Sequence, residues 1–67
     1  MANCKYENTA FDLSECVDDI AYFLNEGKTL SEYLNSLTDY ERATVSRIVY
    51  LAQDFTDAYY QLELKEG

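Results

Sequence analysis

Apolar residues recur at steps of three and four along most of this chain, which is the spacing of one face of a helix. The first clear run comprises Leu13, Cys16, Val17, Ile20, Phe23 and Leu24. Asp12 precedes this run as a possible N-cap, and Glu15 follows it three residues later, which is the spacing of a capping box. Gly27 stands after the run, where a left-handed C-cap would be expected. We therefore predict a first helix over about residues 13–26.

Two further capping-box patterns divide the remainder of the chain. Thr29 with Glu32 opens a short second helix, predicted over about 30–37, and Thr38 with Glu41 opens a long third helix over about 39–62. The third helix carries an unbroken heptad seam, in which apolar residues alternate at steps of three and four. The seam consists of Val45, Ile48, Ala52, Phe55, Tyr59 and Leu62.

These elements predict an all-α fold, a small three-helix bundle in a single domain of 67 residues. The chain has no proline and only two glycines, too few turn residues for a sheet fold of this size. Residues 1–10 are expected to be a flexible N-terminal segment and residues 64–67 a loose tail. The third helix is longer than the first two, which can cover only part of it. Another segment must therefore pack against Phe55, Tyr59 and Leu62. The N-terminal segment can supply it, and so can a second copy of the chain in a homodimer.

The formal net charge of −8 narrows the class of partner. It argues against direct binding of nucleic acid, whose affinity comes largely from phosphate neutralisation, and against docking on anionic lipid. It favours a basic protein, of which nucleic-acid-binding proteins are the commonest kind. The first residues contain no apolar run typical of a signal peptide, and no stretch is long and apolar enough for a membrane span, so a cytoplasmic location is expected.

The acidic residues are concentrated opposite the apolar face of the first predicted helix. Six of them and no basic residue fall between Glu7 and Glu26, and a shorter acidic stripe follows on the third helix. Such a stripe either keeps a small protein in solution or forms a docking surface that copies nucleic acid. Tyrosines among the carboxylates favour docking, because tyrosine stacks on arginine and is enriched at binding hot spots. The predicted partner-binding residues are Asp12, Glu15, Asp18, Asp19, Tyr22, Glu26, Tyr50, Asp54 and Asp57.

Catalytic and metal chemistry find little support. The chain has no histidine, no Cys-x-x-Cys pair and no calcium-binding loop, so neither a metal, a cofactor nor an enzyme activity is expected. Cys16 lies on the apolar face, which indicates a reduced cysteine in the core. A bridge from Cys4 to Cys16 is the alternative and would need an oxidising compartment.

The expected function is therefore that of a small acidic inhibitor that docks on a basic, nucleic-acid-binding protein and blocks it. In size and charge the chain resembles the small acidic proteins that phages and mobile elements encode against host defence, anti-CRISPR proteins among them. That resemblance implies action in a host cytoplasm. The alternative is a helical homodimer, regulatory or structural, that binds its partner through the apolar seam of the third helix, with Phe55, Tyr59 and Leu62 in the interface.

Overall fold

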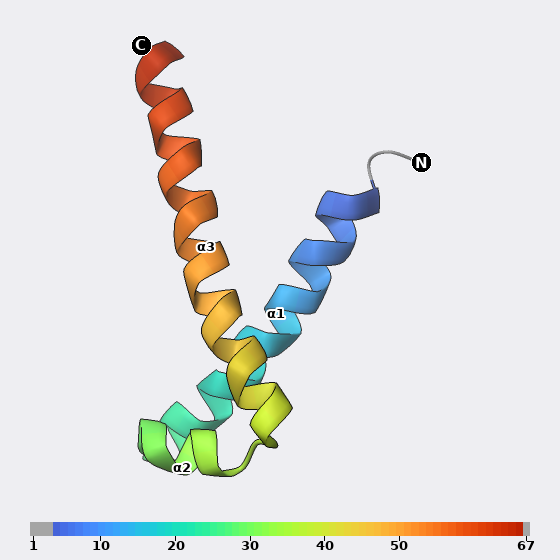
Figure 1. Cartoon of the computed structure of the whole chain (residues 1–67), viewed down its shortest axis with the longest axis vertical. Helices are drawn as coiled ribbons and strands as arrows, with labels where there is room; N and C mark the ends of the chain where they lie inside the picture. The colour runs from blue at the N-terminus through green and yellow to red at the C-terminus, as the bar shows by residue number, and fades with distance from the viewer. Residues whose placement is uncertain (1–3, 67) are drawn as a thin grey trace. The chain divides into compact units, whose positions relative to one another are not determined.

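The computed structural model describes residues 4–66 and the side chains of residues 4–65. Three helices follow one another within this range: α1 (Cys4–Asn25), α2 (Leu30–Asn35) and α3 (Asp39–Glu66) (Figure 1). No strand occurs in the described part of the chain, so the all-α prediction is confirmed. The chain divides into two compact units, one ending at Ser36 and the other beginning at Leu37.

The first helix begins earlier than predicted. It starts at Cys4, so residues 4–10 are helical where a flexible segment was expected, and residues 1–3 lie outside the described range. Asp12 is therefore inside the helix and is not its N-cap. Helical hydrogen bonds and an apolar row that continues upstream through Tyr6 and Ala10 outweigh the capping preference of one aspartate.

The end of α1 is a Schellman motif, in which Gly27 is the left-handed C-cap that the sequence predicted. Gly27 has a φ of +70°, which glycine adopts without steric cost. Its backbone N–H donates to the carbonyl of Leu24 at 3.1 Å, and the N–H of Lys28 donates to the carbonyl of Phe23 at 2.9 Å. These two bonds satisfy carbonyls that the helix itself leaves open, and they fix the turn toward α2.

The short helix α2 is held at its start by the predicted capping box. The backbone N–H of Thr29 donates to a carboxylate oxygen of Glu32 at 2.9 Å, and the N–H of Glu32 donates to the hydroxyl of Thr29 at 3.2 Å. The ring of Tyr33 meets the ring of Phe23 edge to face, with centroids 5.2 Å apart. Phe23 and Tyr33 are both half-buried, and this aromatic pair is a direct contact between α1 and α2.

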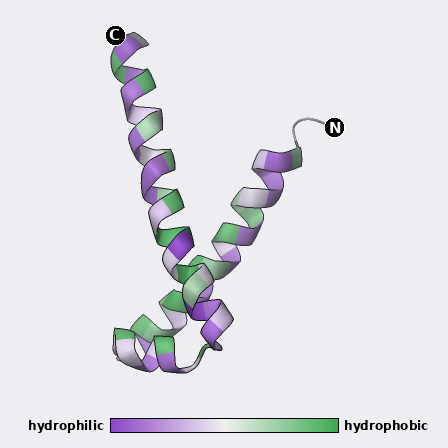
Figure 2. Cartoon of the chain, viewed as in Figure 1, coloured by the Kyte–Doolittle hydropathy of each residue, from purple (hydrophilic) through white to green (hydrophobic). Residues whose placement is uncertain are grey.

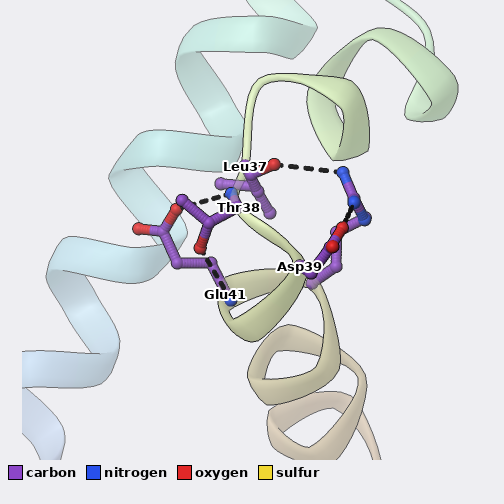
Figure 3. A network of polar contacts seen from close by, with 5 residues as sticks. Leu37, Thr38, Asp39 and Glu41 are labelled. Atoms are coloured by element: carbon purple, nitrogen blue, oxygen red, sulfur yellow. Dashed lines mark hydrogen bonds and ion pairs between the residues drawn. The ribbon is translucent and has the colours of Figure 1, made fainter.

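A second capping box opens α3, again as predicted (Figure 3). The N–H of Thr38 donates to the Glu41 carboxylate at 2.9 Å, and the N–H of Glu41 donates to the Thr38 hydroxyl at 3.1 Å. Arg42 adds a bond to the carbonyl of Leu37 at 3.0 Å and an ion pair with Asp39. These contacts fix the first turn of the helix.

The third helix is longer at its C-terminal end than the sequence predicted. The helix continues past Leu62 to Glu66, where a tail over 64–67 was expected, and Gly67 lies outside the described residues. Leu64 falls off the seam, but neither glycine nor proline interrupts the backbone before Glu66, so nothing stops the helix at Leu62.

None of the side chains of residues 4–65 is buried. Hydrophobic and hydrophilic residues alternate along both long helices (Figure 2), and much of the apolar surface is exposed. The half-buried residues in the unit that ends at Ser36 include Cys16, Phe23 and Leu34, and those in the other unit include Val45 and Ile48. Packing of the three helices into a bundle therefore stays a prediction.

Both cysteines lie in α1, which tests the alternative of a bridge between Cys4 and Cys16. Cys4 is exposed and Cys16 is half-buried, and both are free thiols. Twelve helical residues separate their backbones by about 18 Å, far beyond the reach of a disulfide. A bridge within one chain is thus excluded while α1 is intact. Cys16 is also less buried than the predicted core cysteine.

Candidate functional site

The carboxylates of α1 share one side of the helix. At 100° per residue, the acidic residues and two aromatic residues among them occupy an arc of about 140°. All of them are exposed. We call this surface the acidic face; it consists of Glu7, Phe11, Asp12, Glu15, Asp18, Asp19 and Tyr22.

Most of the predicted α1 site residues are therefore brought together. Five of the six lie on the acidic face itself: Asp12, Glu15, Asp18, Asp19 and Tyr22. The sixth, Glu26, lies in the turn that follows the helix, and its backbone N–H donates to the carbonyl of Tyr22 at 3.0 Å. The turn thus keeps Glu26 next to the last residue of the face.

Two residues of the acidic face were not among the predicted site residues. Because α1 begins at Cys4, Glu7 and Phe11 are helical and align with the carboxylates that follow. The sequence held a signal for this: Tyr6 and Ala10 continue the apolar row of Leu13 at helical spacing. The aspartate cap pattern at residue 12 concealed it.

Phe11 changes the chemistry of the face. Phe11, Glu15, Asp18 and Tyr22 follow one another at steps of four, three and four, which places them in a single row along the helix. Phe11 is 65% exposed and Tyr22 is 61% exposed. The row therefore has a pair of carboxylates at its centre and an aromatic ring at each end, about 16 Å apart along the axis.

The ring of Tyr22 contacts the aromatic pair that connects α1 and α2. This ring meets that of Phe23 edge to face at 5.7 Å, and Phe23 in turn packs on Tyr33. A ring that is held on one edge and exposed elsewhere loses less side-chain freedom when a partner covers it. The contact between α1 and α2 thus restrains the Tyr22 ring, at the end of the row nearest Glu26, before a partner binds.

No basic side chain of residues 4–65 forms an ion pair with the carboxylates of the acidic face. Lys5, at the start of the same helix, lies over the ring of Tyr6 with its amine 5.1 Å from the centroid. Carboxylates at i, i+3 and i, i+4 on a helix are about 5–6 Å apart and repel one another. The face therefore presents negative charge that the described part of the chain does not neutralise.

The predicted residues on α3 form a separate acidic row. Tyr50, Asp54 and Asp57 are exposed and follow one another at steps of four and three. Near Tyr50 the helix surface has a shallow, open hollow whose lining includes Arg47 and Tyr40. This row belongs to the unit that begins at Leu37, whereas the acidic face belongs to the unit that ends at Ser36.

The predicted interface residues of the heptad seam are also exposed. Phe55 is 64% exposed, Tyr59 is 56% exposed and Leu62 is 67% exposed. All three lie in the continuous helix α3, on the side away from Asp54 and Asp57. The third helix thus carries two different faces, one acidic and one apolar.

Residues 4–66 hold no group of three metal-ligating side chains placed to bind an ion. None of the helices they form is long and apolar enough to cross a membrane. No protein-family model matches the chain, and neither the curated proteins nor the solved structures give a match.

Proposed function

We propose that this protein is a small, non-catalytic inhibitor that docks its acidic face on a basic, nucleic-acid-binding protein and blocks that protein's nucleic-acid site. The observation that supports it is the row of Phe11, Glu15, Asp18 and Tyr22, exposed and without basic neighbours in ion-pair contact. A helix under selection for stability alone would gain from a lysine at i+4 to one of these carboxylates. Their accumulation on one side favours a role in binding.

The spacing of the carboxylates supports a site built for nucleic acid as the target. Neighbours at about 5–6 Å on the helix resemble successive phosphates of a strand in reach and in sign. Lysines and arginines that line such a cleft would meet Glu15, Asp18 and Asp19 together. Phe11 and Tyr22 would stack on arginine planes at the two ends, as aromatic rings do at binding hot spots.

The size and charge of the chain favour the anti-defence type of inhibitor, such as the anti-CRISPR proteins of phages and mobile elements. A partner of this kind is met in the cytoplasm, in the host if a phage encodes the chain. The negative charge would raise the rate at which such an inhibitor associates with its target, because a basic cleft attracts it over a long range.

The test compares two variants with equal net charge. Asp18→Asn with Asp19→Asn changes the net charge from −8 to −6, and Glu66→Lys makes the same change at the far end of α3. Wild-type and variant proteins are immobilised and used to capture proteins from a lysate of the encoding or host organism at low salt. The captured protein is then challenged with short double-stranded DNA or RNA.

We expect the wild type and the Glu66→Lys variant to retain a basic protein that nucleic acid displaces. The Asp18→Asn, Asp19→Asn variant should bind the same protein at least about tenfold more weakly, equivalent to about 1.4 kcal/mol. Wild-type binding should also fall steeply as salt shortens the Debye length below about 10 Å. Equal weakening of both variants, or capture that nucleic acid does not displace, would overturn the proposal.

A second candidate function rests on the apolar seam of α3. Because Phe55, Tyr59 and Leu62 are exposed and no described side chain is buried, the chain has apolar surface available for a second copy. In this alternative the three helices complete a bundle by homodimerisation, and the acidic residues mainly keep the assembly in solution. Phe55→Asp or Tyr59→Asp should then abolish binding, whereas substitutions at Asp18 and Asp19 should not.

A further inference from the structure

We infer that α3 pairs with α3 of a second copy of this chain in an antiparallel arrangement, with Ala52 facing Phe55 of the partner subunit. This inference rests on the second candidate function and adds the orientation and register of the pair. It does not depend on the acidic face of α1.

The seam on α3 is long enough to support such a pair. The helix is continuous over 28 residues, or about 42 Å at 1.5 Å per residue. Ala52, Phe55, Tyr59 and Leu62 are exposed along it, while Val45 and Ile48 are half-buried and keep surface to contribute. The next seam position toward the N-terminus is Glu41, which is engaged in the capping box, so the apolar seam begins at Val45.

An antiparallel register matches small residues with large ones. In heptad notation Val45, Ala52 and Tyr59 are the a positions of the seam, and Ile48, Phe55 and Leu62 are the d positions. In an antiparallel pair each a residue faces a d residue of the other helix. In the register proposed here, the numbers of two facing residues always add to 107. The layers pair Val45 with Leu62, Ile48 with Tyr59 and Ala52 with Phe55. Each layer occurs twice by the two-fold symmetry of a dimer. At the centre, each alanine leaves room for the phenylalanine of the other subunit.

A parallel pair fits the same side chains less well. It would set Ala52 against itself, and Phe55 and Tyr59 each against their own copies. The alanine layer would then contain too little side-chain volume and the aromatic layers too much, which leaves voids beside crowded rings. The antiparallel register also overlaps nearly the whole helix, because residue 42 meets residue 65 and the ends coincide to within about two residues.

Charges beside the seam favour the same orientation. In the antiparallel register, Arg42 flanks Glu63 of the partner subunit, and the pair occurs at both ends. Within its own chain Arg42 binds the carbonyl of Leu37 and the carboxylate of Asp39, so the contact with Glu63 of the partner subunit would form beside these bonds. In a parallel pair the flanking positions bring Ala58 to Glu63, and no opposite charges meet.

The experiment uses the full-length chain with Cys4 and Cys16 replaced by serine, carrying one spin label at a new cysteine. Lys65→Cys and Gln53→Cys are prepared separately, because both positions are exposed and outside the seam. Sedimentation equilibrium gives the oligomeric state, and pulsed electron resonance gives the distance between labels. No partner protein is present, so the result is independent of the inhibitor proposal.

We expect a dimer in which the labels at residue 65 lie about 35 Å apart along the helix axis. Residue 65 faces residue 42 of the partner subunit, and 23 residues at about 1.5 Å each separate these two positions. Labels at residue 53 should be close, because that residue faces residue 54. Short distances at both positions would show a parallel pair, and a monomer at the concentrations used would show no pair at all. Either result overturns the inference.

A charge-reversal cycle gives an independent check. Arg42→Glu and Glu63→Arg should each weaken the dimer several-fold, and the double variant should recover part of the loss. Arg42→Glu also removes contacts within the first turn of α3, so only the coupling between the two positions is diagnostic. Strictly additive losses would contradict the predicted contact.

Discussion

At the scale of single residues, Glu32 shows how strongly local hydrogen bonds shape this chain. The N–H of Thr29 donates to its carboxylate and lowers the pKa of Glu32 from the ordinary value of 4.5, with smaller help from the Thr29 hydroxyl and from Lys28, against a desolvation effect. The carboxylate is exposed, so the effect comes from a bond rather than from burial. The same pair of capping-box hydrogen bonds recurs between Thr38 and Glu41.

We predict that the start of α2 loosens in acid. Because the folded-state pKa of Glu32 is depressed, its contribution is fully present above 4.5 and is lost as the pH falls through that lower pKa. An NMR titration of the Glu32 carboxyl should give a lower pKa in the native protein than in urea. Thr29→Ala should restore only part of the difference, because its backbone N–H, the larger cause, remains. Equal pKa values in the native and urea-unfolded states would refute this account.

At the scale of elements, local signals in the sequence determine where helices start and stop. The stop at Gly27 and the starts at Thr29 and Thr38 were predictable, because each depends on contacts within a few residues. The start of α1 was not predicted, because a cap at Asp12 and a longer helix from Cys4 are both locally acceptable. Only the continuation of the apolar row upstream distinguishes them.

This difference had a direct consequence for the candidate site. The carboxylates from Asp12 to Asp19 could be placed on one face from their spacing alone. Phe11 could not, since a residue ahead of an N-cap and a residue inside the helix point in different directions. The relation between the first two helices and α3 depends on long-range packing, for which the sequence supplies apolar faces but no unique pairing.

The helical state of the N-terminal segment can be tested with proline. Thr9→Pro should remove helical hydrogen bonds within α1 and cost about 3 kcal/mol in that segment, seen as lost ellipticity at 222 nm and shifted amide signals over residues 4–10. Lys5→Pro, in the first turn, is the matched control and should have little effect. If the two prolines behaved alike, the helix would not begin at Cys4.

At the scale of the whole molecule, the chain combines a net charge of −8 with no buried side chain among residues 4–65. Repulsion between carboxylates therefore opposes folding, while little apolar burial within one copy offsets it. Both proposed interactions relieve this imbalance: a basic partner neutralises the acidic face, and a second copy covers the seam of α3. The two features that lower the folding stability of the isolated chain, its unneutralised charge and its exposed apolar surface, are also the ones that would favour binding.

We accordingly predict that salt stabilises the isolated protein. Raising sodium chloride from about 10 mM to about 200 mM shortens the Debye length from about 30 Å to under 10 Å and should raise the thermal midpoint. The rise should be smaller in the Asp18→Asn, Asp19→Asn variant, which has less repulsion to screen. A midpoint that fell with salt would mean that ion pairs hold the fold together.

The position of Cys4 offers a practical route to these measurements. Eighteen residues separate it from Tyr22, which is five full turns, so the thiol stands on the same line of α1 about 27 Å away. It is exposed, whereas Cys16 is half-buried. A fluorophore attached there would report occupancy of the carboxylate row without altering any of its charges, and a change in its emission would follow docking in real time.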